Sequence, residues 1–398
     1  MSKQLALFGL GLLLLAIDPV PAQEKQESSR SGPVKKLTVH LVDADNNPVS
    51  GAHVGTRAIL WHKRLRPELA DAAGFMYLPH SLSNNSGVAE IESKEGDLRD
   101  PWGRIGIVAR HDGRGLVAIA DIDSTHLTRP LSLTLVPECR VSGTIHCPEL
   151  AKLGRKVGWT NVYLSIGRNR LMGCDSEEGG DFHFFLPPGR YSLNAYGTYL
   201  ASKNQSITVS SDKREMKLDL TAPATRFALL RGLPAPELRE IVGWKNSAPL
   251  RLADLKGKCV VLHFWGYWCG PCIHEMPAMF ELYDRYAKQG LVVIGVHVEV
   301  GPEGIDSAAK LDAKLADIRK AQWHGRDIPY PVAFTKGLEC QVLKDYGVRS
   351  FPSQLLIDRR GNLVDILTPG PKGVAVLQKC LDEKAGNSSA SGVRGPES

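Results

Sequence analysis

The chain has 398 residues, of which 43% are hydrophobic and 23% are charged, and its 49 basic and 43 acidic side chains give a net charge of +6. This length exceeds what one hydrophobic core usually organises, and it predicts two to three domains. The composition is that of a soluble globular protein and excludes a largely disordered chain. Basic residues do not cluster with aromatic ones, so we expect no nucleic-acid partner.

The first 22 residues have the pattern of a secretory signal peptide. Lys3 precedes an apolar run of 13 residues, Leu5–Ile17, and Val20 and Ala22 occupy the −3 and −1 positions of a signal-peptidase site. An uncleaved anchor is the alternative, but such a run at ~1.5 Å per residue covers about 20 Å of a ~30 Å hydrocarbon core. We therefore predict cleavage after residue 22, a secreted or periplasmic protein, and no membrane span after cleavage.

A polar segment at 23–36 is predicted to be a flexible leader. Beyond it, Leu37, Val39 and Leu41 alternate with polar residues, and short runs of the same kind recur between turn clusters. Such a pattern is typical of strands with one buried face. It predicts a β-sandwich module over residues 37–137.

A second β-sandwich module is predicted over residues 138–220. Its clearest segment is GDFHFFLPPGRYSL at 180–193, where apolar residues alternate on both sides of a Pro-Pro-Gly turn. This pattern predicts two strands that pair with each other. The segment resembles the carboxypeptidase-regulatory type of sandwich, and NPVSGAHV at 47–54 resembles the opening hairpin of the same family. The resemblance implies small sandwiches without catalysis.

The pattern changes after a linker at 221–232 that contains Pro and Gly. Over residues 233–385, buried strands alternate with segments of helical spacing, which predicts an α/β domain with helices on both faces of a mixed sheet. The tail at 386–398 is expected to be disordered. Strands are predicted at 260–264, 291–298 and 353–357, and helices at 271–289, 307–321 and 373–381.

Cys269 and Cys272 form a Cys-x-x-Cys pair where a predicted strand gives way to a predicted helix. Disulfide exchange requires a thiolate, and an ordinary Cys with a pKa of ~8.5 is mostly protonated at neutral pH. At a helix start, unpaired N–H groups and the helix dipole stabilise the anion. Cys269 is therefore the expected nucleophile, and Cys272, one turn further on, is placed to resolve the mixed disulfide.

Other uses of such a pair fit the sequence less well. Structural zinc needs a second pair of ligands, and the nearby histidines form none. Haem attachment needs His where Ile273 stands, and a peroxiredoxin-type peroxidase needs Thr or Ser where Gly266 stands. We expect no metal and no cofactor. The other six cysteines are interpreted as small buried hydrophobic side chains: Cys139, Cys147, Cys174, Cys259, Cys340 and Cys380.

The segment FWGYWCGPC at 264–272, with EMP at 275–277, resembles the active site of the thioredoxin superfamily. The likeness runs from about residue 233 to residue 381 and is greatest to the exported TlpA/ResA-like thiol–disulfide oxidoreductases. It implies a thioredoxin-like fold with a redox-active disulfide. It also implies supporting roles in the active site for Trp268, Gly270 and Pro271.

The segment YGVRSFPS at 346–353 resembles the second active-site loop of that family. In the family, the residue before the proline is joined to it by a cis peptide bond, and its backbone pairs with the substrate. The resemblance therefore implies a cis bond between Phe351 and Pro352; an ordinary loop proline is the alternative.

Two residues are candidates for handling the proton of Cys272. Glu275 resembles a Glu of the exported reductases, and a buried carboxylate with a raised pKa can take the proton as Cys272 attacks. His263 stands where thioredoxin has a buried Asp. The alternatives are a solvated helix residue for Glu275 and a core histidine for His263.

The sequence therefore predicts two all-β sandwich modules followed by a thioredoxin-like enzyme that reduces disulfides of exported proteins through Cys269 and Cys272. Its expected partners are a protein disulfide substrate and a thiol-reducing donor protein. One alternative is an oxidase or isomerase that uses the same residues. The other is a non-enzymatic envelope binding protein whose Cys pair is a structural disulfide.

Overall fold

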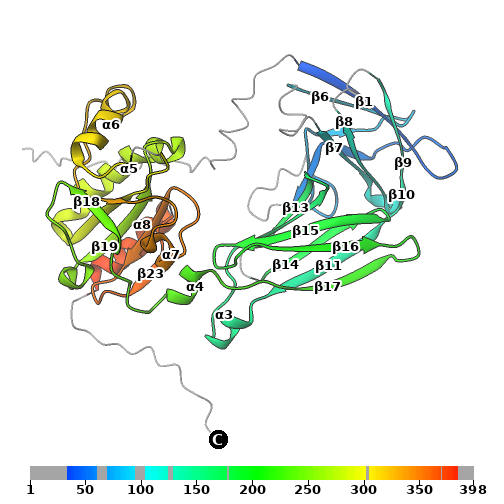
Figure 1. Ribbon diagram of the computed structural model, residues 1–398. Coiled ribbons are helices and arrows are strands. Elements are labelled where there is room, and N and C mark those ends of the chain that lie inside the picture. Colours follow the sequence, from blue (N-terminus) through cyan, green and yellow to red (C-terminus); the bar gives the residue numbers. More distant parts are fainter. Residues whose placement is uncertain are drawn as a thin grey trace, which may run out of the picture. The chain divides into compact units, whose positions relative to one another are not determined.

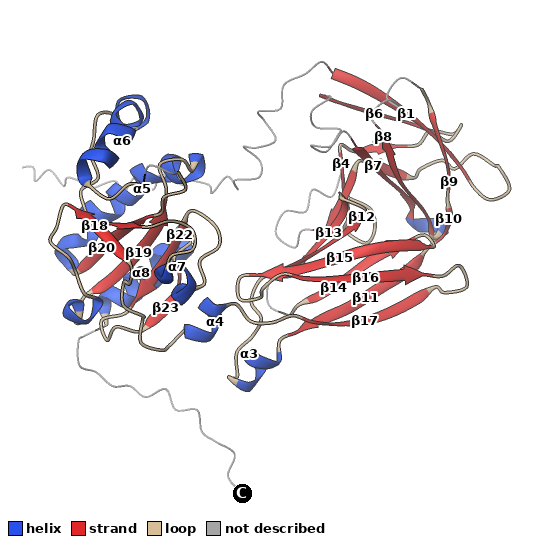
Figure 2. Cartoon of the chain, viewed as in Figure 1, coloured by secondary structure: helices blue, strands red, loops and turns tan. Residues whose placement is uncertain are grey.

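The computed structural model describes residues 34–60, 70–94, 104–123, 129–176, 179–301, 304–368 and 370–383. The predicted signal peptide, the leader as far as residue 33 and the predicted tail lie outside these residues. The described chain forms two compact units that divide between Leu229 and Leu230 (Figure 1). Strands dominate the first unit, and helices flank a sheet in the second (Figure 2). No helix in the described ranges is long and apolar enough to cross a membrane.

The first unit begins with two sheets whose buried side chains form one cluster. In β1, Leu37, Val39 and Leu41 are buried and alternate with more exposed residues, as expected for a strand with one face in a core. The first sheet has the order β6 (Val88–Lys94), β1 (Val34–Val42), β9 (Leu131–Thr134). The second has the order β10 (Val136–Pro137), β8 (Leu116–Asp123), β7 (Arg104–His111), β2 (His53–Gly55), β5 (Ser81–Leu82).

The prediction of a leader as far as residue 36 is wrong for its last three residues. Strand β1 starts at Val34, which pairs with Lys94 of β6. The polar residues that suggested a leader lie on an exposed part of this strand, where the Lys36 ammonium is 2.7 Å from the Glu90 carboxylate. Opposite charges on neighbouring strands favour the pairing.

Two further sheets enclose the larger core of the first unit. One has the order β14 (Asp181–Leu186), β11 (Cys139–His146), β17 (Glu215–Thr221). The other has the order β16 (Lys203–Val209), β15 (Gly189–Gly197), β12 (Thr160–Ile166), β13 (Asn169–Ser176), β3 (Arg57–Leu60), β4 (Met76–Leu78). The short helices are α3 (Pro148–Lys152) and α4 (Arg226–Leu230), the latter within the predicted linker.

Strands β14 and β15 form as predicted from the segment at 180–193, but they do not pair with each other. Strand β14 pairs with β11, and β15 pairs with β12 and β16, so the Pro-Pro-Gly turn carries the chain from one sheet to the other. Pro187 and Pro188 have no N–H to donate to a hairpin. The Tyr191 hydroxyl instead donates a hydrogen bond to the Pro187 carbonyl at 2.8 Å and fastens this corner.

The hairpin of β3 and β4 belongs in sequence to the predicted first module but pairs with β13 in the six-stranded sheet. Near this hairpin, a buried ion-pair network joins the Arg110 guanidinium to the carboxylates of Asp71 and Glu138, each at 2.7 Å. The division of this unit into modules at 37–137 and 138–220 stays a prediction. The hairpin of β3 and β4 comes from residues 37–137 but belongs to the six-stranded sheet formed mainly by residues 138–220.

The second unit has one mixed sheet with the order β18 (Ile241–Lys245), β21 (Val332–Thr335), β20 (Leu291–His297), β19 (Cys259–Trp265), β22 (Ser353–Ile357), β23 (Leu363–Ile366). The central strands β19, β20 and β21 are parallel, and the outer strands pair antiparallel. All seven residues of β19 are buried, which is typical of a strand covered on both faces. The helices are α5 (Gly270–Tyr286), α6 (Ala308–Gln322), α7 (Gln341–Tyr346) and α8 (Pro371–Asp382).

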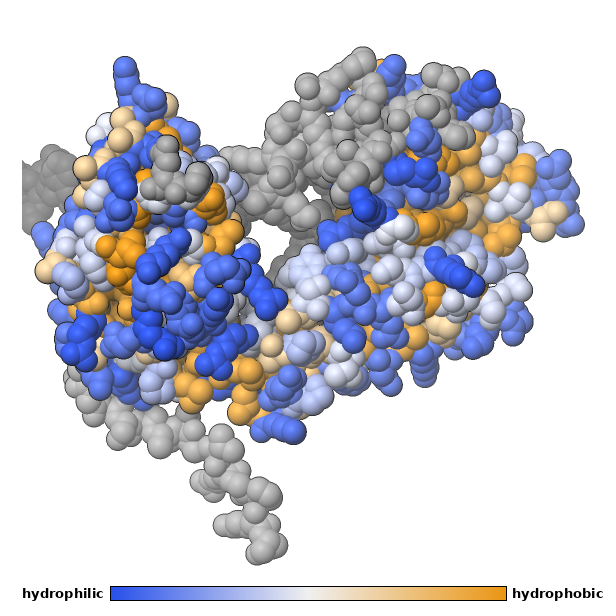
Figure 3. All heavy atoms as spheres, in the orientation of Figure 1, coloured by the Kyte–Doolittle hydropathy of each residue, from blue (hydrophilic) through white to orange (hydrophobic). Residues whose placement is uncertain are grey.

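The surface of the described residues is mixed in character. Figure 3 shows hydrophilic side chains over most of the visible face, with apolar ones interspersed. Among the large exposed hydrophobic side chains, Trp268 is 37% exposed and Val300 is 48% exposed. Single exposed apolar residues are ordinary on a protein surface. Exposure alone therefore assigns no binding role to Trp268 or Val300.

Candidate active site

The Cys pair lies where β19 meets α5. Strand β19 ends at Trp265, and the amide of Cys269 donates a hydrogen bond to the Gly266 carbonyl at 3.1 Å, which closes a tight turn into the helix. Cys269 is the N-cap residue of α5 and forms a disulfide with Cys272, with 5.3 Å between the two Cα atoms. Cys269 is 7% exposed, whereas Cys272 is fully buried. The outer sulfur therefore belongs to Cys269.

The start of α5 is suited to a thiolate. The backbone N–H of Cys272 donates to the Cys269 Sγ at 3.3 Å, so one otherwise unpaired amide of the first turn points at this sulfur. Pro271 stands in the same turn, where its missing N–H costs no hydrogen bond. The dipole of the 17-residue helix adds partial positive charge at its N-terminus. Once the disulfide is reduced, these features favour the Cys269 anion.

Trp268 and the loop around Pro352 lie beside the Cys pair. The Trp268 indole N–H donates to the Val298 carbonyl at 2.9 Å, and its ring packs edge-on against Phe351 with 5.5 Å between the centroids. The peptide bond between Phe351 and Pro352 is cis, which confirms that prediction. Phe351 packs against the same hydrophobic cluster as Cys269. The two predicted active-site segments therefore meet in space.

Glu275 lies on α5, three residues after Cys272, and is partly buried. Its Oε2 atom has no hydrogen-bond partner among the described residues. Burial raises the pKa of the Glu275 carboxyl, and a hydrogen bond with the Gln354 side chain opposes the rise. A carboxyl in this setting accepts a proton more readily than an exposed one, which fits it for proton transfer.

His263 is fully buried in β19, and neither ring nitrogen has a hydrogen-bond partner among the described residues. Burial lowers its pKa to about 3, so the imidazole is neutral at physiological pH. The ring packs parallel to Trp265 with 6.4 Å between the centroids. Gln354 of β22 pairs with His263 in register, which places His263 near the partner of Glu275.

Sequence reasoning missed a second buried histidine, His297, at the end of β20. The Tyr267 N–H donates to its Nε2 at 3.4 Å, and the two rings are stacked with 5.8 Å between the centroids. Burial lowers the pKa of His297 to about 3. The sequence shows only that His297 stands near the end of the predicted strand 291–298; the strand register that sets it opposite Trp265 appears in the structure. Within the described ranges, no group of three or more His, Cys, Asp and Glu side chains is arranged to hold a metal.

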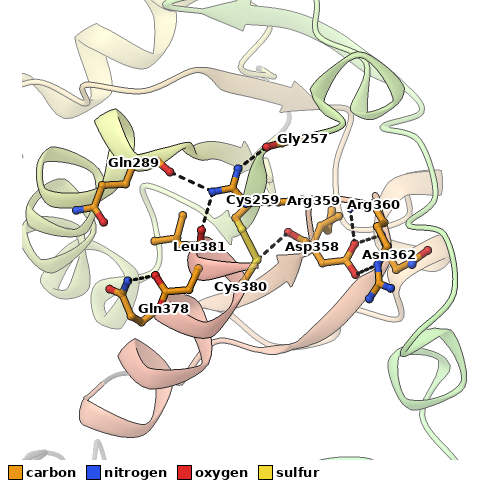
Figure 4. The surroundings of a disulfide bond; sticks show 12 residues. Gly257, Cys259, Gln289, Asp358, Arg359, Arg360, Asn362, Gln378, Cys380 and Leu381 are labelled. Carbon is orange, nitrogen blue, oxygen red and sulfur yellow. Dashed lines mark hydrogen bonds and ion pairs between the residues drawn. A yellow bond between two sulfur atoms is a disulfide. The ribbon is translucent and has the colours of Figure 1, made fainter. Parts of the chain in front are cut away.

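A second disulfide joins Cys259, the first residue of β19, to Cys380 in α8, with 6.4 Å between the Cα atoms (Figure 4). All six of the other cysteines are buried as expected, but these two form a disulfide that the sequence did not predict. Their positions are 121 residues apart in sequence, and only the packing of α8 on the sheet brings them together. The remaining four are free and buried: Cys139, Cys147, Cys174 and Cys340.

Arg359 lies beside this second disulfide and ties three chain segments together (Figure 4). Its guanidinium donates to the carbonyls of Gly257 at 2.6 Å, Gln289 at 3.3 Å and Leu381 at 2.7 Å. These carbonyls belong to the loop before β19, to the end of the 3₁₀ turn that follows α5 and to α8. The base of the strand that leads to Cys269 is therefore held by a covalent bond and by charge-assisted hydrogen bonds.

Comparison with known proteins points to one class of enzyme. Residues 232–366 match the model of the AhpC/TSA family. Over 163 residues, the chain is 39% identical to the thiol-disulfide oxidoreductase ResA of Bacillus cereus (strain ATCC 10987 / NRS 248), and the match covers 38% of this chain and 83% of that relative. The chain belongs to the ResA family of thiol–disulfide oxidoreductases.

Other similar proteins carry related names. The ResA of Geobacillus thermodenitrificans is 38% identical over 145 residues, which cover 36% of this chain and 72% of that relative. A solved structure of a thiol:disulfide interchange protein from Chlorobium tepidum is 25% identical, with a TM-score of 0.28, and covers 38% of this chain and 96% of that chain. The residues matched by the family model all lie in the second unit, so the oxidoreductase activity of this ResA-family protein belongs there.

Proposed function

We propose that this ResA-family enzyme reduces disulfides of exported proteins, with Cys269 as the nucleophile and Cys272 as the resolving thiol. The observation that carries the proposal is the unequal placement of the two sulfurs. Cys269 is the N-cap of α5 and accepts the Cys272 N–H, while Cys272 is fully buried behind it. A substrate disulfide therefore reaches Cys269 first.

The proposed reaction begins with the reduced pair. The Cys269 thiolate attacks one substrate sulfur, which forms a mixed disulfide and releases the other substrate sulfur as a thiolate. The Glu275 carboxylate then takes the proton of the Cys272 thiol, and the Cys272 thiolate attacks the Cys269 sulfur. The enzyme disulfide forms and the second substrate thiolate leaves, so the substrate gains two electrons and the enzyme loses two. A dithiol donor protein restores the reduced pair.

Two features support work outside the cytosol. Disulfides persist in oxidising compartments, and Cys259 and Cys380 form one that is buried and far from the exchanging pair in sequence. Residues 1–22 have the pattern of a signal peptide. We therefore propose a secreted or periplasmic location and exported proteins as substrates.

The test of the reaction is reduction of insulin disulfides by the full-length protein with dithiothreitol as the electron source. Cys269→Ser should abolish the acceleration, and Cys272→Ser should accumulate mixed disulfides that gel electrophoresis without reductant detects. Retention of more than a few per cent of activity by Cys269→Ser refutes the assignment of the nucleophile.

The direction of exchange is tested by the reduction potential of the Cys269–Cys272 couple. A reductase is expected near the ~−270 mV of thioredoxin, whereas a value near the ~−120 mV of DsbA indicates an oxidase. Rapid rearrangement of scrambled disulfides without net reduction indicates an isomerase. Either of these two results overturns the proposed direction while leaving the exchange chemistry intact.

A further inference from the structure

His297 has no part in the exchange reaction described above, yet it is held in place on three sides. Its ring meets Trp265 edge-on at 5.0 Å, stacks on Tyr267 at 5.8 Å and meets Phe334 edge-on at 6.3 Å, all between centroids. The side chain is fully buried. Three aromatic neighbours fix the plane of the imidazole, and with it the direction in which each ring nitrogen points.

One of these nitrogens points at the active-site loop. The backbone N–H of Tyr267 donates to Nε2 at 3.4 Å, so Nε2 carries the lone pair; the proton of the neutral ring is then on Nδ1, which has no hydrogen-bond partner among the described residues. Burial lowers the pKa of His297 to about 3, and the ring therefore stays neutral throughout the pH range in which thiols exchange. The Tyr267 amide thus keeps its acceptor at every working pH.

Two further hydrogen bonds join the end of β19 and the loop after it to Val298, the residue that follows β20. The Val298 N–H donates to the Trp265 carbonyl at 2.8 Å, and the Trp268 indole donates to the Val298 carbonyl at 2.9 Å. His297 holds the residue between these two attachments. The turn that follows sets the position of the Cys269 Sγ, which is 3.3 Å from the Cys272 nitrogen. A small shift of the loop lengthens this contact and weakens the stabilisation of the thiolate.

We propose that His297 is a positioning residue that holds the Tyr267 amide and thereby keeps the Cys269 sulfur at the start of α5. The proposal rests on the proposed role of Cys269 as the attacking thiolate. Without the imidazole acceptor, the Tyr267 N–H, two residues before Cys269, is left without its partner, which costs free energy unless the loop moves. The loop moves, and the Cys269 thiolate loses its amide donor.

The test compares His297→Phe with His297→Gln in the reduced full-length protein. Phe fills the aromatic surroundings but has no acceptor, whereas the Gln amide oxygen lies at nearly the reach of Nε2. The readout is the rate of Cys269 alkylation by iodoacetamide from pH 5 to 10. We expect His297→Phe to raise the apparent pKa of Cys269 and to slow insulin reduction about tenfold, as misplacement of a reacting group does. His297→Gln should leave the apparent pKa of Cys269 close to the wild-type value. Its rate of insulin reduction should stay within about threefold of wild type.

Thr335→Val is the matched control for loss of stability. Thr335 is buried, and its hydroxyl donates to the His297 backbone carbonyl at 3.2 Å, whereas the Tyr267 amide is bound by the His297 ring. This variant should lower the melting temperature without changing the alkylation profile of Cys269. A wild-type profile for His297→Phe, or an equal change in Thr335→Val, overturns the proposal.

Measurements on the wild-type protein keep the proposal testable if His297→Phe does not fold. The ¹⁵N shifts of the imidazole should show the proton on Nδ1 from pH 5 to 9, and the Tyr267 amide should exchange more slowly with solvent than the Trp268 amide. A proton on Nε2, or rapid exchange at Tyr267, refutes the positioning role. If Cys269→Ser is inactive in insulin reduction and His297→Phe has the wild-type alkylation profile, only the positioning role of His297 is refuted. If Cys269→Ser is active, the proposed function is refuted.

Discussion

Gln354 lies directly opposite His263 in the antiparallel pairing of β22 with β19, and its side chain hydrogen-bonds Glu275 of α5. The strand that follows cis-Pro352 therefore supplies the partner of the carboxyl proposed to accept the Cys272 proton. Gln354 therefore lies two residues after the cis proline and also contacts the helix that carries the Cys pair.

The first prediction concerns proton transfer. Glu275→Gln keeps the shape of the side chain but removes the base, so resolution of the mixed disulfide should slow by roughly 10- to 100-fold. The initial attack by Cys269 should change less, because that thiolate depends on the start of α5. Rapid-quench measurement of the mixed disulfide separates the two steps.

His263→Asn is the comparison for this experiment. The imidazole is neutral and has no hydrogen-bond partner among the described residues, so its loss should affect resolution only mildly. If Glu275→Gln resolves at the wild-type rate from pH 6 to 9 while His263→Asn is slow, the roles of the two residues are reversed.

The second prediction concerns stability as a function of pH. The folded-state pKa of Glu275 lies above its unfolded value of ~4.3, because burial penalises the carboxylate. The free energy of unfolding of the wild-type protein therefore falls as the pH rises from the pKa of Glu275 in the unfolded chain to its pKa in the folded protein. Above that pH, Glu275 causes no further change. Glu275→Gln does not ionise, so it should be more stable than wild type at pH 7.5. This advantage should be absent below pH ~4.

Urea unfolding of both proteins at pH 3.5 and 7.5 measures this difference. A variant that is less stable than wild type at pH 7.5 indicates that the ionised carboxyl makes a favourable contact in the folded protein. That result contradicts the proposed environment of Glu275.

The third prediction concerns the second disulfide. Replacing both Cys259 and Cys380 by Ala should lower the free energy of unfolding by about 2–4 kcal/mol, because the bond closes a long loop in the unfolded chain. Insulin reduction at 25 °C should persist, since neither sulfur lies at the start of α5. Loss of exchange activity in a variant that remains folded assigns this disulfide to the reaction.

The fourth prediction concerns the independence of the second unit. Residues 230–385 alone should fold and reduce insulin at the full-length rate, because the Cys pair, Glu275 and Pro352 all lie in this compact unit. A fragment that starts at residue 233 should be less stable, since it lacks the ion pair between Arg231 and Asp365 at 2.9 Å. Melting temperature and insulin turbidity measure both effects.

The complementary fragment, residues 34–229, should show no exchange. Burial raises the pKa of the Cys139, Cys147 and Cys174 thiols, so few thiolates form at neutral pH. Activity in this fragment, or a need for it in insulin reduction by the second unit, contradicts the assignment of the chemistry to residues 230–385.

The geometry of the candidate active site could be predicted from the sequence because its main features are local. A buried strand, a Cys-x-x-Cys pair and a helix follow one another within residues 259–286, and the same short stretch places Cys269 at the helix start. The cis bond before Pro352 was predictable through the resemblance of its loop.

The missed features depend on contacts between distant segments. Cys259 and Cys380 meet only when α8 packs near the start of β19. The strands on either side of Pro187 have the alternation of a hairpin, yet each buries its apolar face better in a different sheet. The surroundings of His297 depend on strand register, which no local pattern of the sequence determines.

The burial of the cysteines determines what a thiol-labelling reagent reports about this protein. Cys269 is 7% exposed, and the other seven cysteines are each 4% exposed or less. In native, reduced protein, an alkylating probe therefore modifies Cys269 first, and the two sulfurs of Cys259 and Cys380 stay unlabelled while their bond is intact. In a redox-proteomics experiment on native protein, the label on this chain should therefore report the reduced form of Cys269, with little signal from the more deeply buried sulfurs.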